Sequence, residues 1–114
     1  MTPLGAEAEQ LAAQYLQQQG LKLITQNYRS RFGEIDLIMQ DGAIVVFVEV
    51  RLRRHAGYGG AAASIDAHKQ KRIIHTAQQY LAGLARVPQC RFDAVLLDDT
   101  RGEQLHWLKN AFDA

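Results

Sequence analysis

The chain has a single cysteine among its 114 residues, so an internal disulfide is excluded. We expect Cys90 to be a small buried residue beside a strand rather than a nucleophile. No apolar run approaches the roughly 18 residues of a membrane-spanning helix. The first residues also lack a basic region followed by an apolar segment. These absences favour a cytoplasmic protein that has no membrane contact.

Sequence patterns for several common chemistries are also missing. The four histidines are scattered without metal-ligand spacing, and no serine lies in a nucleophile elbow. The glycines around Tyr58 match neither a Walker A loop nor a dinucleotide-binding pattern. The chain contains 47% hydrophobic residues and no low-complexity tract. Its length therefore predicts one globular domain spanning residues 1–114, with a substantial core.

The most informative feature that is present is an apolar strand carrying charges. The run Val45–Leu52 is apolar except for Glu49 and Arg51, which alternation places on one face. Burying an unpaired charge costs several kcal/mol, so these side chains need a partner or a ligand. Two interpretations remain open: Glu49 and Arg51 form an ordinary ion pair at a strand end, or they belong to a functional site.

A second acid is predicted to lie close to Glu49. Residues 34–39 are typical of a strand, and Asp41–Gly42 is a strong hairpin signal before the next strand. With Asp41–Gly42 as the loop, Asp36 faces Phe47. Glu49 then lies diagonally across from Asp36 on the same face, about 7 to 8 Å away. Two carboxylates at this spacing suit Mg²⁺ or Mn²⁺, which prefer oxygen ligands, and indicate phosphodiester chemistry.

Basic residues are concentrated in the middle of the chain. Residues 51–91 contain eight Lys or Arg and a single acid, Asp66, whereas the remainder holds five basic and eleven acidic residues. A basic segment directly downstream of an acidic cluster is what a metal-dependent enzyme acting on a polyanion needs. The alternative is an ordinary solvated helix face.

Two helices are predicted to flank these strands. Residues 4–19 carry an apolar stripe, with Glu9 at its border, where the carboxylate can reach inward or stay exposed. A second helix is expected from near Asp66 to Arg86, capped by Ser64 or Asp66. On this helix Lys69 borders the buried face, where a lysine either extends into solvent or presents its ammonium to a neighbouring site.

The remaining apolar segments complete the architecture. Residues 21–28, 90–97 and 104–109 predict further strands, which gives the order αβββαββ. The long segment between Leu52 and Cys90 permits a parallel crossover through the second helix. An α/β protein with a mixed central sheet and helices on its faces is therefore expected.

Five sequence motifs together resemble the bacterial YraN-type uncharacterised protein family, over nearly the whole chain. They are Gly33–Ile38, Phe47–Arg51, Tyr58–Ser64, Lys69 and Arg91–Asp93. That family is related to the PD-(D/E)xK nuclease superfamily, which includes archaeal Holliday-junction resolvases and tRNA-splicing-endonuclease-like domains. The resemblance implies a restriction-endonuclease-like, three-layer α/β/α fold.

The resemblance also implies roles for individual residues. Asp36 corresponds to the metal-binding acid of the second core strand, and Glu49 corresponds to the acid of the (D/E)xK element. Glu9 resembles the first-helix glutamate that completes the site in resolvase-like members. The carbonyl of Val50 is a further candidate metal ligand. One departure concerns Arg51, which stands where the motif has lysine.

Arginine stays protonated at ordinary pH, so Arg51 is not a general base. It can still stabilise charge on the phosphate, as a catalytic cation, or it can pair with Asp36 and Glu49 and silence the site. Lys69 is the residue able to supply the missing ammonium.

The sequence therefore predicts a nuclease-like protein that binds structured or branched nucleic acid, DNA more than RNA, and uses Mg²⁺ or Mn²⁺. Arg53, Arg54, Lys71 and Arg72 are expected to follow the nucleic-acid backbone. Symmetric cutting of two strands by so small a domain favours a homodimer. Two alternatives remain: a noncatalytic nucleic-acid-binding module on the same fold, and a protein-interaction domain.

Overall fold

The computed structural model describes residues 3–52, 65–98 and 105–113. The helices and strands within these ranges follow the predicted order αβββαββ. They are α1 (Pro3–Gln18), β1 (Lys22–Ser30), β2 (Gly33–Asp41), β3 (Ile44–Leu52), α3 (Ala67–Ala82), β4 (Cys90–Leu97) and β5 (Leu105–Phe112).

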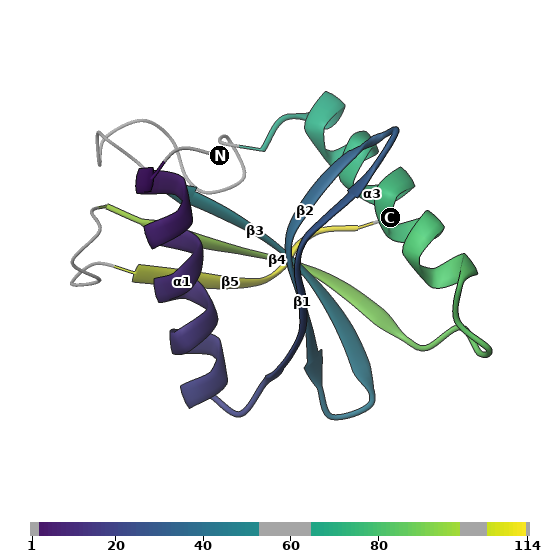
Figure 1. The fold of residues 1–114 in the computed structure, drawn as a ribbon, viewed down its shortest axis with the longest axis horizontal. Coiled ribbons are helices and arrows are strands. Elements are labelled where there is room, and N and C mark those ends of the chain that lie inside the picture. The colour runs from purple at the N-terminus through teal and green to yellow at the C-terminus, as the bar shows by residue number, and fades with distance from the viewer. Residues whose placement is uncertain (1–2, 53–64, 99–104, 114) are drawn as a thin grey trace.

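The strands form one five-stranded sheet in the order β1-β2-β3-β4-β5. Neighbouring strands are antiparallel except β3 and β4, which run parallel because α3 provides the crossover between them. Figure 1 shows α1 and α3 on opposite sides of the sheet. The mixed sheet with helices on both faces confirms the predicted three-layer α/β/α architecture. Among the described residues, neither helix has the length and apolarity needed to span a bilayer.

Alternation along the strands divides the core into two layers. One layer packs the sheet against α1, and the other packs it against α3. The central strands are buried on both faces, as β3 shows by its continuous run of buried residues from Val45 to Glu49. The α1 layer includes Ala12, Leu16, Leu37, Val48 and Val95, and the α3 layer includes Ile38, Phe47, Ile73, Ala77 and Ala94.

Helix α3 begins as predicted but ends early. The Asp66 carboxylate caps it by accepting a hydrogen bond from the Lys69 backbone N–H at 2.8 Å. The other predicted cap, Ser64, lies outside the described residues. At the far end, the N–H of Gly83 closes the last turn on Tyr80 O at 3.2 Å, so the helix stops before the predicted Arg86.

The register of the β2–β3 hairpin differs from the predicted one by two residues. Asp41 pairs with Ile44, so the loop is Gly42–Ala43 rather than Asp41–Gly42. Gly42 takes the first loop position with φ +61°, a conformation that favours glycine in tight hairpins. Because the shift is an even number of residues, every side chain keeps its predicted face.

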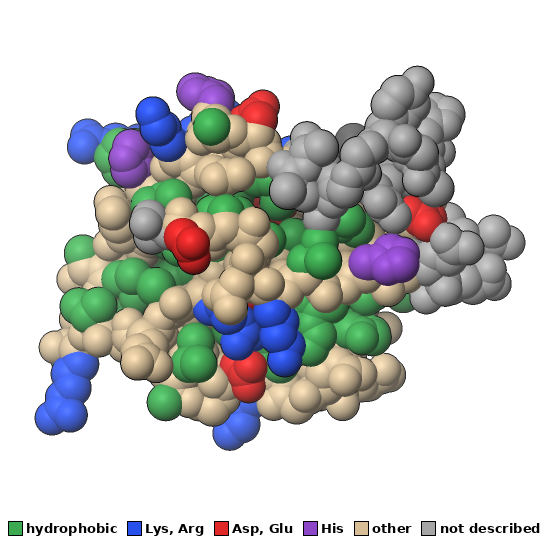
Figure 2. Space-filling view, turned by 180° about the vertical axis from the view of Figure 1, so that it is seen from behind, with side chains coloured by type: hydrophobic (Ala, Val, Ile, Leu, Met, Phe, Trp, Pro, Cys, Tyr) green, Lys and Arg blue, Asp and Glu red, His purple; other side chains and the backbone are tan. Residues whose placement is uncertain are grey.

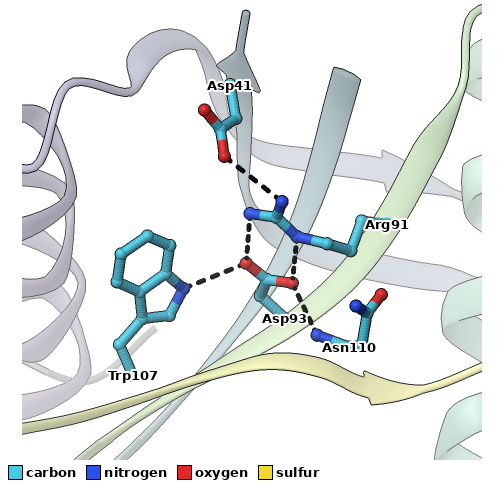
Figure 3. Close-up of polar contacts among 5 residues, drawn as sticks. All are labelled: Asp41, Arg91, Asp93, Trp107 and Asn110. Atoms are coloured by element: carbon cyan, nitrogen blue, oxygen red, sulfur yellow. Dashed lines mark hydrogen bonds and ion pairs between the residues drawn. The ribbon is translucent and has the colours of Figure 1, made fainter.

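An ion-pair network around the buried Asp93 joins β4 to β5 and to the end of β2 (Figure 3). The side chain of Asp93 is completely buried, and Arg91 donates to it through Nε (2.8 Å) and Nη2 (2.9 Å). Trp107 Nε1 (2.9 Å) and the Asn110 backbone N–H (3.1 Å) also donate to this carboxylate. Arg91 Nη1 reaches Asp41 at 3.2 Å, so the network connects β4, β5 and the end of β2.

Cys90 contradicts its prediction. It is exposed at the first residue of β4 rather than buried beside a strand. Cys90 is the first residue of β4, and the buried part of this strand begins only at Phe92.

Candidate active site

The candidate site lies where β2 and β3 separate. Their ladder ends at the pair Leu37 and Val48, and one further step of this register sets Asp36 opposite Glu49. Beyond the ladder, the Val50 N–H donates to Asp36 Oδ2 at 2.8 Å. The Asp36 carboxylate thus accepts a hydrogen bond that a backbone carbonyl of β2 would accept if the ladder continued. This contact holds the carboxylate between the two strands.

Two more acids lie beside Asp36. Single carboxylate oxygens of Glu9, Glu34 and Asp36 all fall within 4.8 Å of one another. The side-chain amide of Asn27 is assigned with its nitrogen towards the acids, because its oxygen would otherwise face only acceptors. In that orientation Asn27 donates to Glu9 Oε1 (3.0 Å) and Glu34 Oε1 (2.7 Å). Helix α1 and strand β2 therefore contribute acids to one cluster.

Crowding of these acids changes their protonation. Burial, followed by repulsion from Glu49, raises the pKa of Asp36 to about 8, although the Val50 N–H opposes the shift. Burial also raises the pKa of Glu9, with repulsion from Glu34 and Glu49 adding to the effect. The nearby acids thus disfavour further negative charge, which is the electrostatic condition that a cation relieves.

Two cations contact Glu49 from different elements. The Glu49 side chain is only 5% exposed, and Lys69 Nζ lies 3.1 Å from its Oε1 atom. Arg51 Nε lies 3.6 Å from the same oxygen, which is ion-pair range but too long for a hydrogen bond. Within the described part of the chain, this buried Arg51 Nε has no hydrogen-bond partner. Lys69 from α3 is therefore closer to Glu49 than the residue in the motif position.

Glu34, Asp36, Glu49 and Lys69 line a pocket of about 250 Å³ between the sheet and α3, whereas Glu9 and Arg51 are not among its lining residues. Its lining is mainly polar, and it combines acids from the strands with cations from the helix. The lining residues are Gly33, Glu34, Asp36, Glu49, Lys69, Arg72 and Ile73.

The structure thus brings together the predicted residues Glu9, Asp36, Glu49, Arg51 and Lys69. At Val50 the observed contact is made by the backbone N–H, and a metal-binding role for its carbonyl stays a prediction.

The predicted backbone-binding residues fall into three groups. Arg72 lines the pocket, and its Nε donates to Phe32 O at 3.1 Å. Lys71 is exposed on α3 and is not among the pocket residues. Arg53 and Arg54 lie outside the described residues. Figure 2 shows Lys, Arg and His side chains gathered over α3, on one surface of the molecule.

Sequence reasoning assigned no role to Glu34, although the signal was available. Glu34 precedes Asp36 by two positions, so alternation along β2 places both carboxylates on one side. Asn27 carried no comparable signal. Its side chain reaches the acids from a residue whose φ of +54° is uncommon for a non-glycine residue, and β1 carries no sequence pattern that predicts this conformation.

The fold and the pocket define a three-layer α/β protein with an acidic site at the split between two central strands. Comparison with known sequences identifies its family. The sequence model of the uncharacterised protein family UPF0102 matches residues 8–97, so the chain belongs to this family. The predicted YraN-type resemblance is confirmed.

Relatives from several bacteria are similar over almost the whole chain. A UPF0102 protein of Nitrosomonas europaea is 58% identical over 109 residues, covering 96% of this chain and 92% of its own length. A UPF0102 protein of Methylobacillus flagellatus is 53% identical over 114 residues, with complete coverage of both chains. A third, from Dechloromonas aromatica, is 52% identical over 113 residues, covering 99% of this chain and 91% of the relative.

Proposed function

We propose that the protein is a metal-dependent nuclease that binds structured or branched nucleic acid, DNA in preference to RNA, and hydrolyses phosphodiester bonds. The observation that carries the proposal is that Asp36, Glu49 and Lys69 line one pocket and that Glu9 lies beside Asp36, although these four residues come from four different elements. A cluster of acids beside a cation, in which one acid, here Asp36, has a strongly raised pKa, is typical of a catalytic site.

The donor atoms fit a hard divalent cation. The three oxygens of Glu9, Glu34 and Asp36 lie within 4.8 Å of one another, and all are carboxylate oxygens, which Mg²⁺ and Mn²⁺ prefer. Glu49 adjoins Asp36 and supplies a fourth carboxylate. When bound, such an ion lowers the pKa of a coordinated water and neutralises nonbridging phosphate oxygens.

Lys69 takes the role that the motif assigns to the lysine at the position of Arg51. Its ammonium lies 3.1 Å from Glu49 Oε1, where it can hold this carboxylate in place and orient the attacking water. Arg51 stays protonated and serves as a fixed cation for charge that develops on the phosphate oxygens. In the proposal, Lys69 on α3 orients the water and Arg51 on β3 stabilises the phosphate charge, so the two residues share the functions of the single motif lysine.

The basic face of α3 supports binding of a polyanion beside the pocket. Arg72 lines the pocket, and its guanidinium is oriented by the Phe32 carbonyl. Lys71 is exposed on the same helix. In the proposal, Arg72 contacts the phosphate nearest the acids and Lys71 contacts the backbone further away, which makes binding dependent on salt.

A second candidate function is a noncatalytic nucleic-acid-binding module. It is favoured by the two contacts of Glu49 with Lys69 and Arg51, because this arrangement also suits an ion-pair network that only stabilises the fold. This candidate predicts salt-sensitive binding that persists without divalent metal and survives the loss of Glu49.

Cleavage assays separate the two functions. Labelled single-stranded, duplex, flapped and four-way-junction substrates are incubated with Mg²⁺ or Mn²⁺. Wild type is compared with an identically purified Asp36→Asn/Glu49→Gln double variant. Cleavage by wild type alone supports the nuclease. Binding by both proteins without cleavage supports the noncatalytic module, and absence of both activities favours a protein-interaction domain.

A second series tests the division of roles between Lys69 and Arg51. Lys69→Met is expected to reduce cleavage about 100-fold or more, the usual range for losing an acid–base group. Adding Arg51→Lys to that variant is expected to recover part of the activity, because it restores the motif lysine. Lys22→Met is the matched control, since Lys22 is exposed at the opposite end of β1 from the pocket. An equal loss in Lys22→Met would contradict the assignment.

A further inference from the structure

The turn between β1 and β2 is fixed firmly to α3. Ser30 Oγ accepts a hydrogen bond from the Phe32 N–H at 3.0 Å and lies 3.1 Å from Thr76 Oγ1. The Phe32 carbonyl accepts from Arg72 Nε at 3.1 Å. Thr76 Oγ1 in turn contacts Arg72 O at 2.8 Å, so the turn and the helix share one hydrogen-bonded network.

This rigid turn carries an aromatic ring outside the core. Phe32 is partly exposed and belongs to neither of the two core layers of the described residues. Its ring contacts His75 edge-on, with centroids 5.3 Å apart and an interplanar angle of 61°. The exposed Arg31 places its guanidinium carbon 5.0 Å from the ring centroid, in the range of a cation–π contact.

The turn that carries the ring is adjacent to the acidic pocket. Gly33, the next residue, lines the pocket beside Asp36. On α3, Lys69, Arg72 and His75 follow one another at intervals of three residues, and they contact Glu49, the Phe32 carbonyl and the Phe32 ring respectively. These three positions span about 9 Å along the helix axis.

We infer that the Arg31–Phe32 turn is a stacking subsite for an unpaired nucleobase about two or three nucleotides from the phosphate in the acidic pocket. The inference rests on the proposed function and specifies the substrate further. An aromatic ring and an arginine plane are the surfaces on which proteins stack unpaired bases. Phosphates of one strand lie about 3.4 Å apart along a duplex axis, so about 9 Å corresponds to two or three nucleotide steps.

The subsite discriminates between nucleic-acid structures. In an intact duplex, the base faces are covered by their stacked neighbours and are not available to Phe32. At a branch, flap or single-stranded end, an unpaired base is free to contact the ring at no cost in base pairing. The turn therefore favours such substrates over continuous duplex.

The test measures binding in EDTA, so it requires neither metal nor hydrolysis. A labelled single-stranded DNA oligonucleotide is compared with an equally long strand of stable abasic sugar analogues. Wild type is expected to bind the intact strand about 10-fold more tightly than the abasic strand. Phe32→Leu is expected to lose about this factor on the intact strand and little on the abasic strand. Phe32→Tyr is expected to restore the preference.

Arg31→Gln and Lys22→Gln form a matched pair, because each removes one exposed positive charge. Arg31 lies in the turn that follows β1, and Lys22 lies at the opposite end of β1. Arg31→Gln is expected to reduce the preference for the intact strand, whereas Lys22→Gln is expected to leave it unchanged. Folding of each variant is verified by its thermal unfolding transition.

Equal binding by wild type and Phe32→Leu, or an equal loss on both strands, would overturn the stacking subsite alone. Failure of wild type to bind either strand would overturn the subsite and the nucleic-acid binding on which it rests. A clear base preference that depends on Phe32, in a protein that never cleaves, would support the subsite and contradict only the nuclease activity.

Discussion

Two clusters of carboxylates lie on this sheet, each with one buried acid, Asp93 or Glu49, and they differ in how their charge is compensated. Asp93 is completely buried and accepts four hydrogen bonds, two of them from Arg91. Among the described residues, Asp36 accepts one hydrogen bond, from the Val50 N–H, and lies among further acids that help to raise its pKa to about 8. In the first, closed cluster both acids, Asp41 and Asp93, contact Arg91, whereas in the second Asp36 is repelled by Glu49 and Glu9.

The comparison shows that burial of an acid does not by itself indicate function. Both clusters include residues of the motifs that resemble the YraN-type family, and both contain a carboxylate close to a cation. A carboxylate whose acceptor atoms are all used stabilises a strand arrangement and has no capacity for a ligand. A group of acids that repel one another costs folding free energy, and a bound cation offsets that cost. We therefore propose a structural role for the Asp93 cluster and a functional role for the Asp36 cluster.

The largest expected effect comes from opening the closed cluster. Asp93→Asn removes the charge that compensates Arg91, whose side chain is only 12% exposed. We expect the free energy of unfolding to fall by about 3 to 5 kcal/mol, the usual cost of breaking a buried pair. Urea denaturation measures this value. An effect below about 1 kcal/mol would show that the network is not structural.

The same substitution in the acidic pocket should have the opposite sign. The pKa of Asp36 is raised from an ordinary value of 3.8 to about 8, so the folded state holds a proton that the unfolded state releases between these values. Stability conferred by the protonated form is therefore present below about pH 4 and is lost as the pH rises to about 8. Asp36→Asn lacks this titration.

In metal-free buffer at pH 8, Asp36→Asn should exceed wild type in unfolding free energy, by an amount on the order of a few kcal/mol. The difference should shrink towards zero near pH 4. Urea denaturation across this pH range provides the measurement. A variant less stable than wild type at pH 8 would mean that the Asp36 carboxylate stabilises the fold, as Asp93 does.

Trp107→Phe is expected to have a smaller effect on the closed cluster. The substitution removes the Nε1 donor to Asp93 Oδ2 but keeps an aromatic ring near Tyr15. Loss of one hydrogen bond to a charged acceptor should lower the unfolding free energy by about 1.5 to 3 kcal/mol. Thermal unfolding measures the change, and unaltered stability would indicate that the remaining donors, Arg91 and the Asn110 N–H, satisfy the carboxylate.

The smallest effect is expected at the rim of the acidic cluster. Arg29 Nε lies 3.1 Å from Glu34 Oε2, but the Arg29 side chain is 68% exposed. Because water and salt screen such a pair, Arg29→Gln should change the unfolding free energy by less than about 1 kcal/mol. A substantially larger fall in the unfolding free energy, measured by urea denaturation, would show that the Arg29–Glu34 pair stabilises the fold.

The sequence was sufficient for the architecture because its signals are local. The strand patterns and the long segment before Cys90 predicted the element order and the parallel crossover, and the structure has both. The face of Asp36 and Glu49 was also predicted correctly, since alternation survives a register shift of two. The register itself was wrong because the choice between adjacent turn positions depends on tertiary contacts, including that of Arg91 with Asp41.

Other features depended on tertiary contacts that no local pattern records. The approach of Lys69 to Glu49 depends on how α3 packs against the sheet, and periodicity placed Lys69 only at the border of a helix face. The Asn27 bridge between Glu9 and Glu34 depends on how α1 packs against the sheet. Cys90 was predicted to be buried from the general preference of its residue type, but the strand end leaves it exposed.

The central claim is that the acidic pocket, and not the closed cluster, binds a divalent cation. Isothermal titration of Mn²⁺ tests this claim directly, in wild type, Asp36→Asn, Glu49→Gln and Asp41→Asn. Asp41→Asn is the control, because it removes an acid from the closed cluster. We predict saturable binding by wild type and Asp41→Asn, and its loss in Asp36→Asn and Glu49→Gln. Equal binding heats in wild type and Asp36→Asn would contradict the account.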